Sequence, residues 1–304
     1  MKGILVVNAF LTGDRYSALY DLLKESFTKK NVELDIITNK DLLIKINDFN
    51  LKCDFVIYWD KDILLSRYLE QRGYKVFNNS KAIELCDDKG LTLMALENKG
   101  IKIPKTIISP FTFDNIPYND FSFVDEVISE IGLPLVVKEN KSSFGMGVSL
   151  VKTKEELISL LKDKKERVIF QEYISSSKGR DVRIEVVNGK AIGSVMRTND
   201  NDFRSNVLRG GKMSAWKAPN AFIEVSEKAA QILGLDFCGV DIMFGNNNEP
   251  ILCEVNSNCH FKTFYTVTNI NLADYISDLI INKIEGKKIW NTVYTVEMNY
   301  MMKL

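Results

Sequence analysis

The chain has 304 residues, a length that predicts about two domains and leaves room for sizeable buried cores. Apolar residues make up 45% and charged residues 26%, which is typical of a folded globular protein and excludes a disordered or fibrous chain. Lysine and arginine total 40, as do aspartate and glutamate, so the overall charge gives no reason to expect nucleic acid or a membrane surface as a partner.

The first 87 residues alternate between strand and helix patterns. Apolar or alternating runs predict strands at residues 4–7, 32–36 and 55–59, and helical spacing predicts helices at 19–27 and 63–72. Strands that alternate with helices are typical of a small parallel sheet covered on both faces. We therefore expect an N-terminal α/β domain that ends near residue 87.

A second unit is expected at residues 88–167. Ser122 and Thr153 begin patterns typical of helix N-caps. Strands are predicted between them at residues 135–138 and 148–151, joined by a polar loop. This pattern favours a hairpin held between helices.

A third unit is expected at residues 168–290, where strands dominate. The strongest turn signal is Asn188-Gly189, a dipeptide typical of a two-residue hairpin. Helices are predicted at residues 229–233 and 272–284. The predicted strands are 168–174, 182–187, 191–196, 240–243 and 251–255. Residues 291–304 show no clear pattern and are interpreted as a tail.

Cysteine and histidine content excludes several kinds of site. Five cysteines without a C-x-x-C pair give neither a disulfide framework nor a zinc ribbon, and they favour a cytoplasmic location. His260 is the only histidine, so a multi-histidine metal site is excluded. No run approaches the roughly 20 apolar residues of a membrane span. We expect chemistry based on carboxylates, lysine, arginine and asparagine.

The clearest candidate site lies on two predicted strands near the C-terminus. Asp241 lies on the first strand, and Glu254 and Asn256 lie two residues apart on the second. Residues two apart on a strand share a face, and a hairpin can bring Asp241 beside them. Three such oxygen ligands suit a hard cation such as magnesium. Solvent-facing acidic strand ends are also common, so both interpretations stay open at this point.

A candidate phosphate site precedes these strands. Lys138 ends a predicted strand, and the loop 142–147 contains small residues whose backbone N–H groups can fold over a phosphate chain. The loop has neither the Walker A nor the Rossmann spacing. A solvated lysine and an ordinary turn remain the alternative.

Arginines gather in the segment that follows. Arg197 precedes residues 202–206, which include Arg204, and Arg209 follows them. Arginines near a carboxylate cluster suit a planar anion, either a transferring phosphoryl group or a substrate carboxylate. The alternative is a mobile surface loop with solvated charges.

The motifs between residues 89 and 256 occur in a characteristic order. In chain order they are Lys89, Pro134-Leu135-Val136-Val137-Lys138, Gly145-x-Gly147, Gln171-Glu172-Tyr173-Ile174, Asp181-x-Arg183, Asp202-Phe203-Arg204-Ser205-Asn206, Arg209-Gly210-Gly211, Gly239-Val240-Asp241 and Glu254-Val255-Asn256. This order resembles the ATP-grasp carboxylate–amine ligases, and most closely the RimK-like family that adds glutamate to ribosomal protein S6. The resemblance covers about residues 1–285 and depends on the order of the motifs.

The resemblance implies a fold and a set of ligands. The α/β domain, with its small parallel sheet of the pre-ATP-grasp type, would precede an ATP-grasp fold of two α+β lobes. Two magnesium ions, or manganese, would be held by Asp241, Glu254 and Asn256, with Glu254 bridging. The residues that would contact ATP are Lys89, Lys138, Ser143, Gly145, Gly147, Glu172, Tyr173, Ile174, Asp181, Arg204, Ser205 and Asn206.

The resemblance also implies a reaction. A carboxylate, such as that of a glutamate-like amino acid, would take the γ-phosphate of ATP, and an amine on a peptide, protein or metabolite would attack the acyl phosphate. Arg197, Arg204 and Asn206 would act at the reacting end. A phosphotransferase that uses the same site and a nucleotide-binding module without turnover are the alternatives. We further expect a homo-oligomer.

Two positions depart from the family pattern. Ser142 stands where the family usually has glycine, and residues 257–262 replace its small-residue, serine, proline and glycine run. The second segment adjoins the metal motif, so we expect it to shape the substrate pocket. Arg183, Arg209, His260 and Lys262 are the candidate substrate contacts, although a lone histidine is more often a packed residue and Lys262 also suits the surface.

Overall fold

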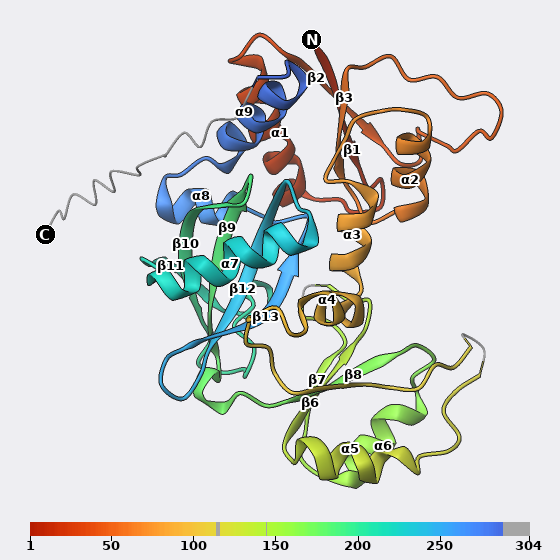
Figure 1. Cartoon of the computed structure of the whole chain (residues 1–304), viewed down its shortest axis with the longest axis vertical. Helices are drawn as coiled ribbons and strands as arrows, with labels where there is room; N and C mark the ends of the chain where they lie inside the picture. The colour runs from red at the N-terminus through yellow and green to blue at the C-terminus, as the bar shows by residue number, and fades with distance from the viewer. Residues whose placement is uncertain (114–115, 144, 288–304) are drawn as a thin grey trace, which may run out of the picture.

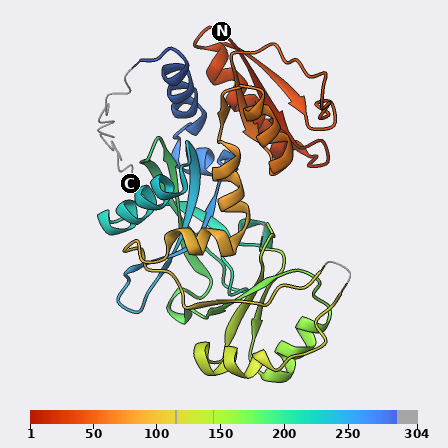
Figure 2. The same ribbon diagram turned by 45° about the vertical axis from the view of Figure 1, so that its right-hand side comes forward.

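The computed structural model describes residues 1–113, 116–143 and 145–287, so the predicted tail at 291–304 lies outside the described residues. The described chain forms three β-sheets with their own helices (Figure 1). The N-terminal domain and the small lobe lie at opposite ends of the long axis, and the large lobe lies between them (Figures 1 and 2). Within these ranges, no helix combines the length and the apolar character that a membrane crossing requires.

The N-terminal domain is built on a four-stranded parallel sheet, which confirms the sequence prediction. The strand order is β2-β1-β3-β4, and every neighbouring pair is parallel. The elements are β1 (Lys2–Val7), α1 (Asp14–Thr28), β2 (Glu33–Thr38), β3 (Phe55–Trp59), α2 (Ile63–Gln71) and β4 (Val76–Phe77). Because β1 and β3 are buried on both faces, they read as continuous apolar runs in the sequence.

Two short helices connect this domain to the rest of the chain. They are α3 (Ser80–Asp87) and α4 (Lys89–Leu96). Asp88 separates them, and its side chain accepts a hydrogen bond of 2.9 Å from the backbone N–H of Leu91. This N-cap begins α4 and places Lys89 at its first turn.

The small lobe is an antiparallel sheet with strand order β5-β8-β6-β7. Its elements are β5 (Thr106–Ile108), α5 (Phe123–Ile131), β6 (Leu135–Glu139), β7 (Val148–Val151), α6 (Lys154–Lys162) and β8 (Val168–Glu172). Both predicted N-caps are confirmed in position: Thr153 caps α6 through its side chain, whereas Ser122 precedes α5 without a side-chain capping hydrogen bond. The strand β8 was expected in the third unit, yet it pairs with β5 and β6 here.

The large lobe is a five-stranded antiparallel sheet with strand order β11-β10-β9-β12-β13. Its elements are β9 (Arg180–Val187), β10 (Lys190–Thr198), β11 (Lys212–Ala215), α7 (Asn220–Leu233), β12 (Phe237–Phe244), β13 (Pro250–Asn256), α8 (Lys262–Thr268) and α9 (Leu272–Ile284). Asn188 and Gly189 both have positive φ, as the predicted hairpin turn requires. The helix predicted at 229–233 begins earlier, at Asn220.

The apolar cores divide the molecule into unequal parts. One continuous core joins the N-terminal domain to the large lobe, and Trp59 stacks on Phe237 within it at a centroid distance of 5.1 Å. The small lobe has a separate core between its sheet and α5 and α6. The N-terminal domain and the large lobe are therefore packed as one unit, whereas the small lobe is joined to them by polar contacts and connecting chain.

Candidate active site

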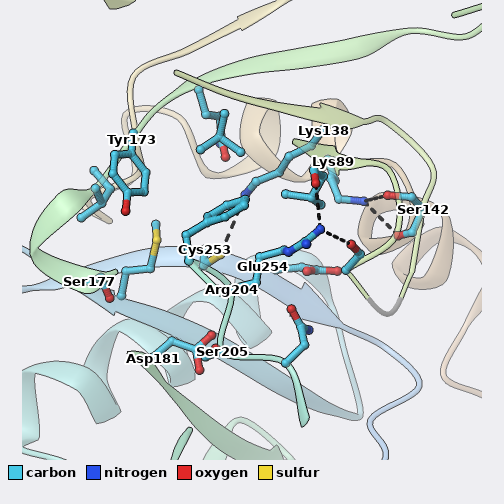
Figure 3. Close-up of a pocket in the computed structure, with 18 of the residues that line it drawn as sticks. Lys89, Lys138, Ser142, Tyr173, Ser177, Asp181, Arg204, Ser205, Cys253 and Glu254 are labelled. Atoms are coloured by element: carbon cyan, nitrogen blue, oxygen red, sulfur yellow. Dashed lines mark hydrogen bonds between the residues drawn. The ribbon is translucent and has the colours of Figure 1, made fainter. Parts of the chain in front are cut away.

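A cleft lies between the two lobes (Figure 3). It is lined by β6 and β8 from the small lobe and by β9, β12 and β13 from the large lobe. The structure brings many of the predicted residues into its lining: Lys89, Lys138, Ser143, Gly145, Glu172, Tyr173, Ile174, Asp181, Arg204, Ser205, Asn206 and Glu254.

One part of the cleft is apolar. Tyr173 and Phe203 meet edge to face with ring centroids 6.2 Å apart, and Val136 and Met243 also line the cleft. Such a slot suits a flat heteroaromatic ring. The sequence analysis missed Val136 and Met243 as site residues, although Val136 precedes Lys138 by two positions and so shares its face of β6.

The other part of the cleft is cationic. The Lys89 ammonium group donates to the backbone O of Ser142 at 2.9 Å and to its Oγ at 3.1 Å. Burial lowers the pKa of Lys89, and the nearby Lys138 charge lowers it further while Glu254 opposes both. Figure 3 shows Tyr173 at one end of the cleft and Lys89 with Ser142 at the other.

Lys138 reaches into the cleft without a carboxylate partner. Within the described residues its ammonium group makes one polar contact, with the Cys253 Sγ at 3.9 Å. Burial raises the pKa of the Cys253 thiol to about 11, so this neighbour is neutral and supplies no counter-charge. Lys138 is therefore available to an anionic ligand.

The loop at residues 142–147, called here the candidate phosphate loop, lies against the segment that carries Arg204. Gly145 has φ of +68°, and a Cβ there would lie 2.8 Å from the Oδ1 of Asn206, so a larger residue would strain the backbone and displace the Asn206 side chain. Arg204 donates to the backbone O of Gly145 at 3.1 Å and of Val148 at 2.8 Å. Gly147 lies outside the lining, because it packs against Glu139.

Beneath the cleft, four buried charged side chains form a network on one face of the large-lobe sheet. Asp181 and Arg197 are directly opposite on β9 and β10, and their side chains are joined by bonds of 2.7 and 2.6 Å. Arg183 and Asp241 are directly opposite on β9 and β12, with bonds of 2.6 and 2.7 Å. Arg197 also lies 3.1 Å from Asp241, which links the two pairs.

One member of this network, Arg197, lies away from the position that the sequence analysis predicted. Arg197 was expected at the reacting end, but it is 5% exposed and lies outside the cleft lining. Cross-strand pairing explains the difference, because it points the guanidinium at Asp181 and Asp241. Burial alone would raise the pKa of Asp241, but Arg183 and Arg197 hold that pKa below its ordinary value.

The three candidate metal ligands lie together. Asp241 is directly opposite Glu254 in the β12–β13 pairing, and the Nδ2 of Asn256 lies 3.4 Å from the Oδ2 of Asp241. Glu254 lines the cleft and accepts no hydrogen bond from the described residues. Among the residues that the structure describes, no three histidine, cysteine, aspartate or glutamate residues are grouped so that they alone could hold a metal ion. Two carboxylates and one amide oxygen nevertheless fit a hard cation that takes further oxygens from phosphate.

The remaining candidate substrate contacts lie outside the cleft lining. The Arg209 side chain is exposed and lies near Gly145. His260 packs edge to face on Tyr16 of α1 at 5.6 Å, and its Nε2 is buried without a partner among the described residues. Burial lowers the pKa of His260, so it is neutral at pH 7. Lys262 begins α8 and is partly exposed.

Comparisons with known proteins agree with this architecture. Residues 86–280 match the family model of the RimK-like ATP-grasp domain. The chain is 33% identical over 257 residues to an uncharacterized protein of Mycoplasma genitalium, across 83% of this chain and 90% of that protein. It is also 33% identical over 219 residues to a probable alpha-L-glutamate ligase of Maridesulfovibrio salexigens, across 70% of this chain and 69% of that protein.

A solved structure shares the fold. The D-alanine–D-alanine ligase of Bacillus anthracis, solved in complex with ATP, superposes with a TM-score of 0.70 at 21% identity. The superposition covers 94% of this chain and 97% of that protein. The predicted fold, a small parallel sheet followed by two ATP-grasp lobes, is confirmed.

Proposed function

The chain belongs to the RimK-like ATP-grasp ligases, and from this premise we propose that it is an ADP-forming carboxylate–amine ligase. The observation that carries the proposal is the cleft itself. It has an apolar slot around Tyr173 at one end, and Lys138 and the Glu254 carboxylate also face into it. A nucleoside triphosphate has the same division between a flat apolar ring and an anionic chain.

In this proposal the nucleotide lies along the cleft. The adenine ring occupies the slot beside Tyr173, and backbone groups of Glu172 and Ile174 meet its edge. Asp181 binds the ribose. Lys89 and Lys138 neutralise phosphate oxygens, and the backbone of the phosphate loop covers them.

Asp241, Glu254 and Asn256 hold magnesium in this proposal. Bound there, the cation would offset the negative charge on the transferring phosphoryl group. Arg183 and Arg197 act indirectly, because they fix the Asp241 carboxylate in its ionised form and orient it. The residues of this chain thus supply a preorganised charge pattern, which is the main contribution of a phosphoryl-transfer enzyme.

The proposed reaction proceeds in two steps. A carboxylate oxygen attacks the γ-phosphorus of ATP, the bond to the ADP oxygen breaks, and an acyl phosphate forms. The amine nitrogen then attacks the acyl carbon, phosphate leaves, and the amine loses a proton. Arg204 and Asn206 border the reacting end in this proposal, and the closed loop limits the access of water.

The relatives suggest the acid. The probable alpha-L-glutamate ligase is named for glutamate, and we propose an acidic amino acid as one substrate here. The partner would be an amine on a peptide, protein or metabolite. Residues 257–262 adjoin the Glu254 motif and lie close to α1 through the His260–Tyr16 contact, so they would shape the substrate end of the site.

The test is an ADP-release screen across amino acids and acceptor amines, with mass spectrometry of the products. We expect ADP formation that requires both an acid and an amine, together with a product whose mass equals the two minus water. ADP with a phosphorylated product would instead indicate a phosphotransferase, and nucleotide binding without turnover would indicate a binding module.

Glu254→Gln provides the variant for this screen. It should fold normally and lose nearly all turnover, because the carboxylate lines the cleft and none of the described residues holds it by an ion pair or hydrogen bond. Glu249→Gln is the matched control, since Glu249 lies on the same β12–β13 hairpin but is paired with Lys102 at the surface. Full turnover in Glu254→Gln would remove the metal assignment.

A further inference from the structure

Lys61 lies outside every motif found in the sequence, yet it joins three parts of the chain. It follows β3 at the carboxyl end of the N-terminal sheet. Its Nζ lies 2.6 Å from the Oδ1 of Asp87, at the end of α3, and 2.9 Å from the Oγ of Ser143. Ser143 belongs to the phosphate loop and lines the cleft.

Lys61 is the donor in both of these hydrogen bonds. An ammonium group only donates, so Lys61 donates to the Ser143 hydroxyl oxygen, and the hydroxyl proton remains available to another acceptor. A phosphate oxygen in the cleft is such an acceptor. The Asp87 carboxylate balances the lysine charge and fixes its direction, because the Asp87 side chain is only 17% exposed.

The charge of Lys61 also reaches the nucleotide end of the cleft. The pKa of Lys89 is lowered mainly by burial, and Lys138 and Lys61 lower it further. Two lysines from different segments, Lys89 and Lys138, therefore line the cleft, and Lys61 lies behind them against Ser143 of its lining. An isolated surface salt bridge would account for the Asp87 contact, but not for the second bond to a loop residue that lines the cleft.

We propose that Lys61 is a positioning residue of the nucleotide site, through which the N-terminal domain holds Ser143 of the phosphate loop in place for a triphosphate. This inference rests on the proposed function, because it takes ATP as the ligand of the cleft. It extends that function by giving the N-terminal domain a part in nucleotide binding.

The experiment compares the binding of two probes, a nonhydrolysable ATP analogue and adenosine, by titration calorimetry. The variants are Lys61→Met, Lys61→Arg, Ser143→Ala and the double variant Lys61→Met with Ser143→Ala. Lys2→Met is the matched control, because Lys2 is also on the N-terminal sheet, is 41% exposed against 39% for Lys61, and is paired with Asp35 at 2.7 Å.

We expect Lys61→Met to weaken binding of the ATP analogue by about five- to tenfold and to leave adenosine binding unchanged. Lys61→Arg should retain most of the affinity. The double variant should bind about as weakly as the weaker single variant, because both changes remove one interaction. Lys2→Met should match the wild type with both probes.

Three results would overturn the inference. They are an unchanged affinity of Lys61→Met for the ATP analogue, an equal loss for adenosine, or effects of the two single variants that multiply in the double variant. A wild-type protein that binds neither probe would instead refute the proposed function, and the inference with it. Whether the wild-type protein binds the probes therefore distinguishes a failure of the Lys61 inference from a failure of the proposed function.

Discussion

The two lobes that enclose the cleft organise charge in opposite ways. In the large lobe, Asp181, Arg183, Arg197 and Asp241 are buried and bonded to one another across neighbouring strands. In the small lobe, Lys138 faces the cleft with a neutral thiol as its polar neighbour. The large lobe therefore holds its charges in fixed positions before a ligand arrives, whereas the small-lobe lysine acquires its counter-charge from the ligand.

The difference follows from the cores. The large lobe shares an apolar core with the N-terminal domain, so its strands are held on both faces and can support a buried ion network. The small lobe has its own core and meets the large lobe mainly through polar groups at the cleft. Movement between the lobes would thus change the lysine contacts and leave the ion network intact.

The largest effect is expected from breaking the ion network. Asp241→Ala leaves Arg183 and Arg197 buried without that partner, and we expect a loss of about 3–5 kcal/mol in the free energy of unfolding, together with loss of turnover. Urea denaturation measures the first effect. Asp278→Ala is the control, because it removes a partly exposed pair whose lysine, Lys30, keeps its bonds to the backbone O of Asp274 and to Ser277, and it should cost less than about 1 kcal/mol. Equal losses in the two variants would contradict the preformed network.

The next largest effect is expected from a buried carboxylate of the large lobe, Glu185. Glu185 lies two residues beyond Arg183 on β9 and is 0% exposed. Neither of its carboxylate oxygens makes a well-formed hydrogen bond with the described residues, and its nearest polar neighbour is the thiol of Cys259. Burial raises the pKa of Glu185 to about 7, which Arg183 only partly offsets. The folded protein therefore binds this proton more tightly than the unfolded chain does.

Because the pKa of Glu185 is raised on folding, the folded protein becomes less stable as the pH rises. The contribution of the protonated Glu185 is present in full below the unfolded pKa of 4.5 and is lost as the pH rises to about 7. Between pH 5 and pH 8 we expect stability to fall by about 2–3 kcal/mol through this group. Urea denaturation at both pH values should show a flatter profile for Glu185→Gln. Glu224→Gln, an exposed change on α7, controls for the lost charge, and identical profiles for Glu185→Gln and wild type would refute the assignment.

A smaller effect is expected where the two lobes touch. Arg204 is held by Asp202 at 2.7 Å and donates to phosphate-loop carbonyls from across the cleft. Arg204→Ala should lower kcat by about a hundredfold, while nucleotide binding is partly retained. Steady-state kinetics and a separate binding titration distinguish the two. An unchanged kcat would remove Arg204 from the reacting end.

The smallest effect concerns the small lobe alone. Lys138→Met should weaken binding of the ATP analogue by about tenfold and leave the free energy of unfolding nearly unchanged, because no carboxylate of the described residues pairs with the ammonium group. Calorimetric titration and urea denaturation provide the two measurements. Lys152→Met, an exposed change that follows β7, is the control. A large loss of stability would show that Lys138 is part of a fixed network after all.

Local patterns predicted much of the fold. The alternation of strands and helices before residue 87 predicted the parallel sheet, Asn188-Gly189 predicted the hairpin, and Thr153 predicted a helix start. The assignment of strands to lobes was harder to predict, because β8 directly precedes the strands of the large lobe in the chain yet pairs with β5 and β6. Pairing partners far apart in the sequence leave no trace in local periodicity.

The sequence by itself determined the family, the order of the motifs and the residue types that line the cleft. Only the tertiary structure decided which of them face it: Arg197 on β10 and Asp241 on β12 meet across the intervening strand β9, and Lys61 reaches the loop at residues 142–147 from another domain. Spacing along the chain fixes which face of a strand a side chain occupies. It does not fix which strand lies next to it, and charges separated by many residues find their partners only when the sheets assemble.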